Sequence, residues 1–133
     1  MTTTPPLLLA RVGAAGCRAT SGVIHAELYL HGYRVIPGIG PAFLLQASAA
    51  FAVSLLLPLT PTVIPQLIAA AVTLGALGGF AASRTIRVFG FIEYGLQPAP
   101  QALISVLVEI AALALLAVPL RDRTTRSALS PSH

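Results

Sequence analysis

Three residues of this sequence have types and positions that could do chemistry: His25, Gln46 and Glu109. Each lies inside a long apolar run, where a polar or ionisable side chain is costly and by default indicates a functional site. If the runs are helices that rise about 1.5 Å per residue, Glu109 lies about 13 Å, His25 about 12 Å and Gln46 about 8 Å from the same end of the bundle. The three side chains could therefore meet in one half of the bundle, with Ser105 one turn above Glu109, and bind a proton, a polar headgroup or a quinone carbonyl.

Two other interpretations of these residues stay open. They could form a structural network that holds three helices in register, or each could be satisfied separately. A haem would need an axial ligand beyond His25 or His31, and the sequence supplies no specific second one. The chain has no nucleophile elbow, phosphate loop, paired acid–base motif or nucleotide fingerprint, so catalysis is not predicted and no particular cofactor is indicated.

Glu27 and His31 stand four residues apart, which is a helical spacing for metal ligands. One histidine and one carboxylate make an incomplete site, so no metal centre is predicted. We expect an ordinary Glu–His pair at a helix end instead. Tyr29, Tyr33 and Arg34 are predicted to be anchors in the headgroup layer, where aromatic and basic side chains are common.

The elements that would position these residues follow from a very apolar composition. The chain has 133 residues, of which 56% are hydrophobic and 9% are charged, and its mean hydropathy is +0.85. Soluble domains carry about 25% charged residues, so this chain has too little charge to cover a water-facing surface. All eight basic residues are arginines at the ends of apolar runs, which does not provide the basic surface that a nucleic-acid partner needs.

The apolar runs predict an all-α, integral membrane four-helix bundle with short loops. The predicted spans are residues 7–30, 41–57, 63–83 and 101–120, in a single domain of residues 1–126 with a disordered tail at residues 127–133. Glycines and prolines at 32–41 exclude regular structure there, and Pro41 suits the first turn of the next helix. In the first span, we expect Arg11 to extend to the near interface and Arg18 to face other helices or reach a headgroup.

The third predicted span carries small residues at intervals of four, which we call the small-residue face: Ala71, Gly75, Gly79 and Ser83. Small residues let another helix approach closely in a bilayer. We therefore predict a non-enzymatic structural or accessory subunit that packs with a membrane-protein partner or with a second copy of itself. The alternative is a redox-associated component that binds a quinone, haem or lipid headgroup at His25, Gln46 and Glu109.

Arginine counts predict the orientation in the plasma (inner) membrane, because basic residues are enriched on the cytoplasmic side. With four spans, both termini share one side, which carries five arginines: Arg11, Arg18, Arg121, Arg123 and Arg126. The opposite side carries three: Arg34, Arg84 and Arg87. Cytoplasmic termini are therefore predicted, and residues 32–41 and 84–100 are expected together on the outer face.

The stretch from His25 to Gln46 reads His-x-x-Leu-Tyr-Leu-His-Gly-Tyr-Arg-x-Ile-Pro-x-Ile-Gly-Pro-x-Phe-Leu-Leu-Gln. Together with Phe89-Gly90-Phe91-x-Glu93 and with Glu109 in the last span, it resembles a family of small four-span membrane proteins common in actinobacteria. The resemblance covers nearly the whole chain. It implies the four-span architecture and leaves the molecular function open.

Overall fold

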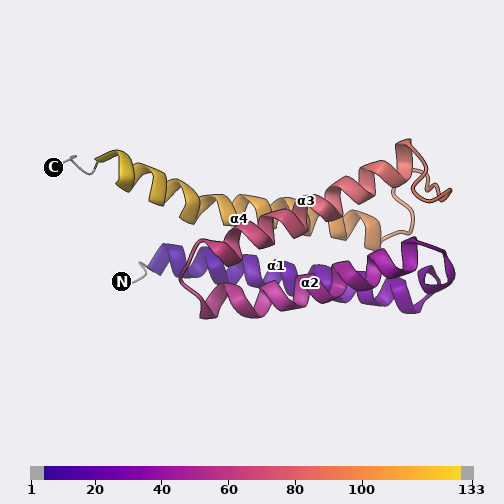
Figure 1. The fold of residues 1–133 in the computed structure, drawn as a ribbon, viewed down its shortest axis with the longest axis horizontal. Helices are drawn as coiled ribbons and strands as arrows, with labels where there is room; N and C mark the ends of the chain where they lie inside the picture. The colour runs from indigo at the N-terminus through magenta and orange to yellow at the C-terminus, as the bar shows by residue number, and fades with distance from the viewer. Residues whose placement is uncertain (1–4, 130–133) are drawn as a thin grey trace.

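The computed structural model describes residues 5–129 and has four long helices. They are α1 (Pro5–Leu30), α2 (Ile39–Leu59), α3 (Ile64–Thr85) and α4 (Gln101–Leu129), with one 3₁₀ turn at Tyr33–Val35 between α1 and α2. The helices run alternately up and down and pack side by side (Figure 1). The predicted all-α four-helix bundle is confirmed.

Each helix contains a segment long and apolar enough to cross a membrane. In α4 this segment is Gln101–Pro119, and in the other three helices it is the whole helix. Large aliphatic side chains cover the outside of the bundle, as at Leu9 and Leu45, which are each 71% exposed. A surface of this kind suits lipid rather than water, so the chain has the build of a multi-pass membrane protein.

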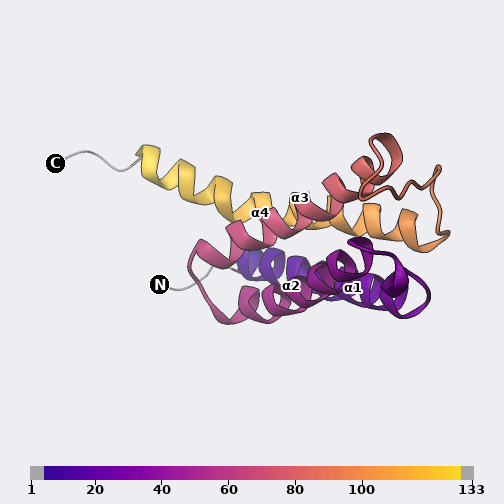
Figure 2. The same cartoon turned by 45° about the vertical axis from the view of Figure 1, so that its right-hand side comes forward.

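The two ends of the bundle differ. Both termini and the turn at residues 60–63 lie at one end, which we call the terminal end, while residues 31–38 and 86–100 form the opposite loop end (Figures 1 and 2). Pro41 lies in the first turn of α2, as predicted. The last helix continues to Leu129, past the expected start of the tail, because the charged residues after position 120 end the apolar span without interrupting helical hydrogen bonding. Residues 130–133 lie outside the described residues.

The hydrophobic core lies in the terminal half of the bundle. Its buried side chains come from all four helices: Ala14, Val53, Leu57, Ala69 and Leu116. The first helix packs most extensively, against α2 and α4. By contrast, the buried residues of α3 all lie in its first half, and the helix diverges from α2 toward the loop end (Figures 1 and 2). The bundle is therefore tight at the terminal end and open at the loop end.

Arg11 extends to the terminal end of the bundle and binds the carboxyl end of α2. It is only 5% exposed, and its Nε and Nη2 atoms donate to the Leu57 carbonyl at 3.0 and 2.6 Å. Nη2 also donates to the Thr60 carbonyl. The Leu57 carbonyl needs an outside donor because residue 61, its partner in a continued helix, is a proline without an N–H. Arg11 thus caps the carboxyl end of α2, where a positive charge is also favoured by the helix dipole.

Candidate functional site: a polar cluster and a cavity at the loop end

A buried polar cluster joins α1 to α4 in the middle of the bundle. Arg18 and Glu109 form an ion pair through Nη2 and Oε2, and their side chains are 0% and 1% exposed. The hydroxyl of Ser21, also fully buried, donates to the other carboxylate oxygen of Glu109 at 2.5 Å. We call Arg18, Ser21 and Glu109 the polar cluster. Both carboxylate oxygens of Glu109 are therefore engaged inside the protein.

The pairing explains how two charges are accommodated at this depth. A lone charge in the middle of a bilayer is costly, whereas a paired and hydrogen-bonded one is tolerated when it faces other helices. Arg18 faces α4, which agrees with the first of its two predicted orientations. Its Nε and Nη1 atoms are buried without a hydrogen-bond partner among the described residues. The polar cluster is thus a tight contact between helices rather than an open site.

His25 stands one turn along α1 from Ser21 and belongs to the loop-end half. Its Nδ1 atom lies 2.8 Å from the Ser21 carbonyl oxygen and 3.4 Å from the Ser21 hydroxyl. A carbonyl only accepts hydrogen bonds, so Nδ1 carries the proton and donates it. In the neutral imidazole, Nε2 is then left with a lone pair. Ser21 therefore connects His25 to the polar cluster.

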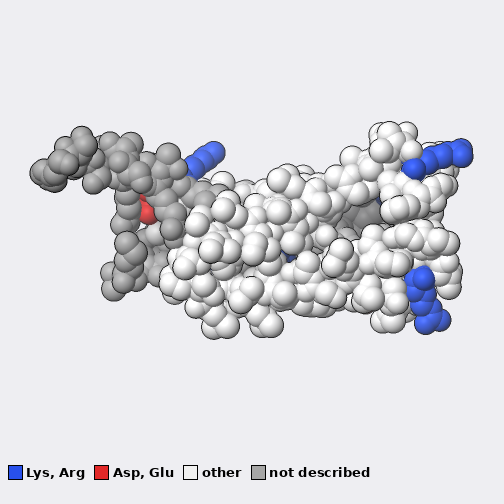
Figure 3. All heavy atoms as spheres, in the orientation of Figure 1, with Lys and Arg blue, Asp and Glu red and all other residues white. Residues whose placement is uncertain are grey.

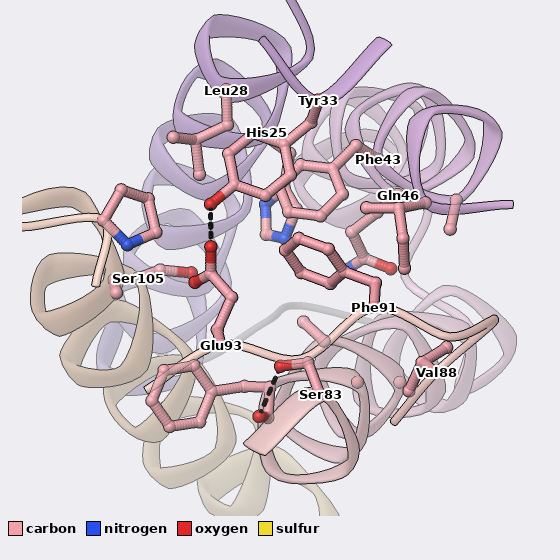
Figure 4. Close-up of a pocket in the computed structure, with 18 of the residues that line it drawn as sticks. His25, Leu28, Tyr33, Phe43, Gln46, Ser83, Val88, Phe91, Glu93 and Ser105 are labelled. Atoms are coloured by element: carbon pink, nitrogen blue, oxygen red, sulfur yellow. Dashed lines mark hydrogen bonds between the residues drawn. The ribbon is translucent and has the colours of Figure 1, made fainter. Parts of the chain in front are cut away.

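A cavity of about 310 Å³ opens at the loop end, where α3 diverges from α2. It appears in the space-filling view as a hollow between the two halves of the bundle, toward the loop end (Figure 3). Four Phe and Tyr side chains line it: Tyr33, Phe43, Phe80 and Phe91. Polar side chains also line this space, among them His25 from α1, Gln46 from α2 and Ser105 from α4 (Figure 4). The other polar lining residues are Ser83 and Arg84 of α3 and Glu93 of the following loop. The walls are thus mainly apolar, with a few convergent polar groups.

Gln46 is held in place by the backbone of α3. Its Nε2 atom donates to the Val72 carbonyl at 2.9 Å. Because that carbonyl is an acceptor, the amide is oriented with nitrogen toward α3, and Oε1 is the atom left over. Oε1 lies 4.0 Å from the place where a Cβ at Gly75 would stand. Gln46 therefore presents a carbonyl oxygen on the α3 side of the cavity.

A hydrogen-bonded bridge covers the cavity at the loop end. The Tyr33 hydroxyl donates to Glu93 (Figure 4), and Arg84 Nη2 lies 3.3 Å from the other oxygen of that carboxylate. The Tyr33 ring stacks on Phe43 with 4.7 Å between ring centroids. Burial, and then the hydrogen bond to Glu93, raise the pKa of Tyr33 above its ordinary range. Tyr33 thus points inward and joins the two loops, and its role as a headgroup anchor stays a prediction.

The structure divides the three predicted site residues between two places. His25 and Gln46 line the cavity together, whereas Glu109 lies deeper and pairs with Arg18. Sequence reasoning missed Arg18 and Ser21 as partners of Glu109. A signal was present, because Arg18, Ser21 and His25 follow the i, i+3, i+7 spacing of one helix face. This spacing does not show which helix packs against that face.

The small-residue face is not packed against another helix within the described residues. Ala71, Gly75 and Gly79 are exposed, and Ser83 is half-buried at the cavity wall. A Cβ at Gly79 would have no atom within 4 Å. The small size of these residues widens the cavity, because Gly75, Gly79 and Ser83 line it. Packing of this face against a partner stays a prediction.

Glu27 and His31 do not form the predicted side-chain pair. His31 Nδ1 instead lies 2.8 Å from the backbone oxygen of Glu27. Among the described residues, no group of three or more histidine, cysteine or acidic side chains is placed to hold a metal ion.

Comparisons of the chain with protein-family models, with curated proteins and with solved structures give no match. Function is therefore inferred from the cavity and the polar cluster.

Proposed function

We propose that this protein binds the ring of a lipophilic molecule of the quinone class in the cavity at the loop end. The observation that carries the proposal is the cavity itself. Its volume of about 310 Å³ falls at the lower end of the size range of small-molecule pockets, which are mostly apolar with a few placed polar groups. Flat aromatic walls at Tyr33, Phe43 and Phe91 suit a flat ring.

The position of the opening favours a ligand that arrives from the bilayer. Leu45, Gly75 and Gly79 line the cavity and are also exposed on the outside of the bundle. The cavity thus opens between α2 and α3, on a side that lipid would cover. Toward the loop end it is bridged by the Tyr33–Glu93 hydrogen bond. A ring could bind inside while an isoprenoid or alkyl tail remains in the membrane.

Haem and phosphate headgroups fit the lining less well. The cavity offers His25 as its one histidine among the lining residues, and a haem held at both axial positions would need another ligand. The one lining cation is Arg84, which already interacts with Glu93 and donates to the Gly95 carbonyl at 2.6 Å. A phosphate would need an available cation, so a neutral ring is the better ligand.

The proposed setting is the plasma membrane with cytoplasmic termini. Arg18 lies in the middle of the bundle and is left out of the count. The remaining four arginines on the side of the termini, against three on the loop side, support this orientation. The cavity would then lie in the outer half of the membrane. A structural or accessory role remains the second candidate, because the exposed small-residue face on α3 leaves room for a helix of another protein.

The test begins with purification in mild detergent, followed by mass spectrometry of co-purified lipophilic material. A short-chain quinone and its hydroquinone are then titrated into the protein in nanodiscs. Two neighbouring glycines give a matched pair of variants, because a Cβ at Gly78 or Gly79 would meet no atom within 4 Å and only Gly79 lines the cavity. We expect Gly79→Leu to weaken binding about tenfold or more, and Gly78→Leu to leave it unchanged.

Absence of both a co-purified lipophile and saturable binding would overturn the proposal. Equal weakening by Gly78→Leu and Gly79→Leu would place any bound molecule elsewhere. A stoichiometric membrane-protein partner in a preparation without ligand would instead favour the accessory role.

A further inference from the structure

We propose that the cavity selects the reduced, hydroxyl-bearing form of its ligand, with His25 Nε2 accepting a hydrogen bond from the ligand hydroxyl. This inference rests on the proposed function and names the chemical class of the ligand more closely. A quinone ring presents carbonyl oxygens, which need donors. A hydroquinone or phenol presents O–H groups, which need acceptors. The free polar atoms of the cavity therefore decide between the two.

His25 is the decisive residue because its donor is already used. Nδ1 donates to the Ser21 carbonyl at 2.8 Å within α1. Nε2 makes no hydrogen bond to the described part of the chain, and His25 lines the cavity (Figure 4). A neutral imidazole with a protonated Nδ1 can only accept at Nε2. The tautomer is thus set by the backbone of its own helix and points an acceptor at the ligand.

Gln46 repeats the pattern from the other wall. Its amide donates to the Val72 carbonyl of α3 at 2.9 Å, which orients Oε1 away from that carbonyl. Oε1 is a second acceptor beside Gly75. The Ser21 carbonyl on α1 thus accepts from His25, and the Val72 carbonyl on α3 accepts from Gln46. Each lining side chain is left with a hydrogen-bond acceptor for the ligand. A ligand hydroxyl can donate a hydrogen bond to either acceptor, whereas a ligand carbonyl is itself an acceptor and cannot.

The strong hydrogen-bond donors among the described lining residues already have acceptors within the protein. The Tyr33 hydroxyl donates to Glu93, and Arg84 donates to Glu93 and to backbone carbonyls. The remaining donors are the Ser105 hydroxyl, which also accepts, and the second amide hydrogen of Gln46. Placing a quinone carbonyl against His25 would bury two unpaired acceptors together, and an unpaired buried polar group is costly.

The test uses three ligands of one shape in wild-type protein in nanodiscs without oxygen: a short-chain hydroquinone, the matching quinone, and the dimethyl ether of the hydroquinone. We expect the hydroquinone to bind about tenfold or more tightly than the other two, which is the effect of one satisfied hydrogen bond in a buried site. This comparison does not depend on the folding of any variant. Equal or tighter binding of the quinone or of the ether would overturn the inference and leave the proposed function intact.

Variants then assign the preference to one atom. His25→Leu should lose the preference for the hydroquinone, His25→Gln should keep part of it because an amide oxygen accepts, and His31→Leu should keep it, since His31 is exposed and lies outside the cavity lining. Helicity and melting temperature establish that each variant is folded. An unchanged preference in a folded His25→Leu protein would overturn the inference. Failure of all three ligands to bind wild-type protein would overturn the proposed function as well.

Discussion

Replacing Glu109 by glutamine should destabilise the protein by about 3–5 kcal/mol, the cost of removing one partner of a buried ion pair. The loss is large because Arg18, at 0% exposure, would keep its charge with no counter-charge on it. Two further guanidinium atoms of Arg18, Nε and Nη1, are already buried without partners in the described chain. Glutamine has nearly the shape of glutamate, so the measured change reports charge rather than packing.

A double-mutant cycle separates the pair from its surroundings. The single variants of the cycle are Arg18→Met and Glu109→Leu, and each should destabilise. In Arg18→Met the carboxylate of Glu109 would lose its cation and keep only the Ser21 hydrogen bond, and in Glu109→Leu the guanidinium of Arg18 would lose its counter-charge. The double variant Arg18→Met/Glu109→Leu should recover most of the loss, because a buried pair replaced by apolar residues is often neutral or stabilising by about 1–4 kcal/mol. Glu27→Gln, at an exposed position of the same helix as Arg18, is the control and should change stability by less than about 0.5 kcal/mol.

The assay is reversible unfolding in mixed micelles with increasing dodecyl sulfate, followed by circular dichroism. A Glu109→Gln protein within about 1 kcal/mol of wild type would refute the reasoning, because it would mean that no charge is paired with Arg18. Additive single variants in the cycle would refute it equally, since coupled partners are not additive.

Three further predictions concern other contacts. Arg11→Met should cost about 1.5–3 kcal/mol in the same assay, because the Leu57 carbonyl loses its charged donor and has no helical one. The pKa of Tyr33 is raised in the folded protein by burial and by Glu93, so the folded state holds this proton more tightly than the unfolded chain. Stability should therefore fall as pH rises above about 10. In melting curves of Tyr33→Phe, that part of the pH dependence should vanish. Gly40→Ala should destabilise by about 1–3 kcal/mol, because its Cβ would lie 2.7 Å from the backbone oxygen of Arg34, whereas Gly16→Ala, which has open space, should be neutral or stabilising by up to about 1 kcal/mol. Equal melting temperatures for the two alanine variants would contradict this account.

The sequence by itself determined the membrane build and the helix count. Apolar runs of span length need only local information, because hydropathy acts on each run separately. The glycines and prolines located the break before α2 for the same reason, and Pro41 lies in the first turn of that helix. The prediction that residues 32–41 have no regular structure was wrong in part, because Tyr33–Val35 form a 3₁₀ turn and α2 begins at Ile39. The last boundary was less predictable: charges after residue 120 indicate where an apolar span ends, but helical hydrogen bonds continue to Leu129.

Which of the predicted site residues lie together was decided only by the tertiary structure. His25, Gln46 and Glu109 were identifiable as costly polar residues in apolar runs, but depth along a helix says nothing about rotation around it. Rotation turns Glu109 toward Arg18 and Ser21, and leaves His25 and Gln46 on a cavity. That cavity exists because α3 diverges from α2 toward the loop end. Its packing angle depends on contacts among all four helices, and no single stretch of sequence encodes it.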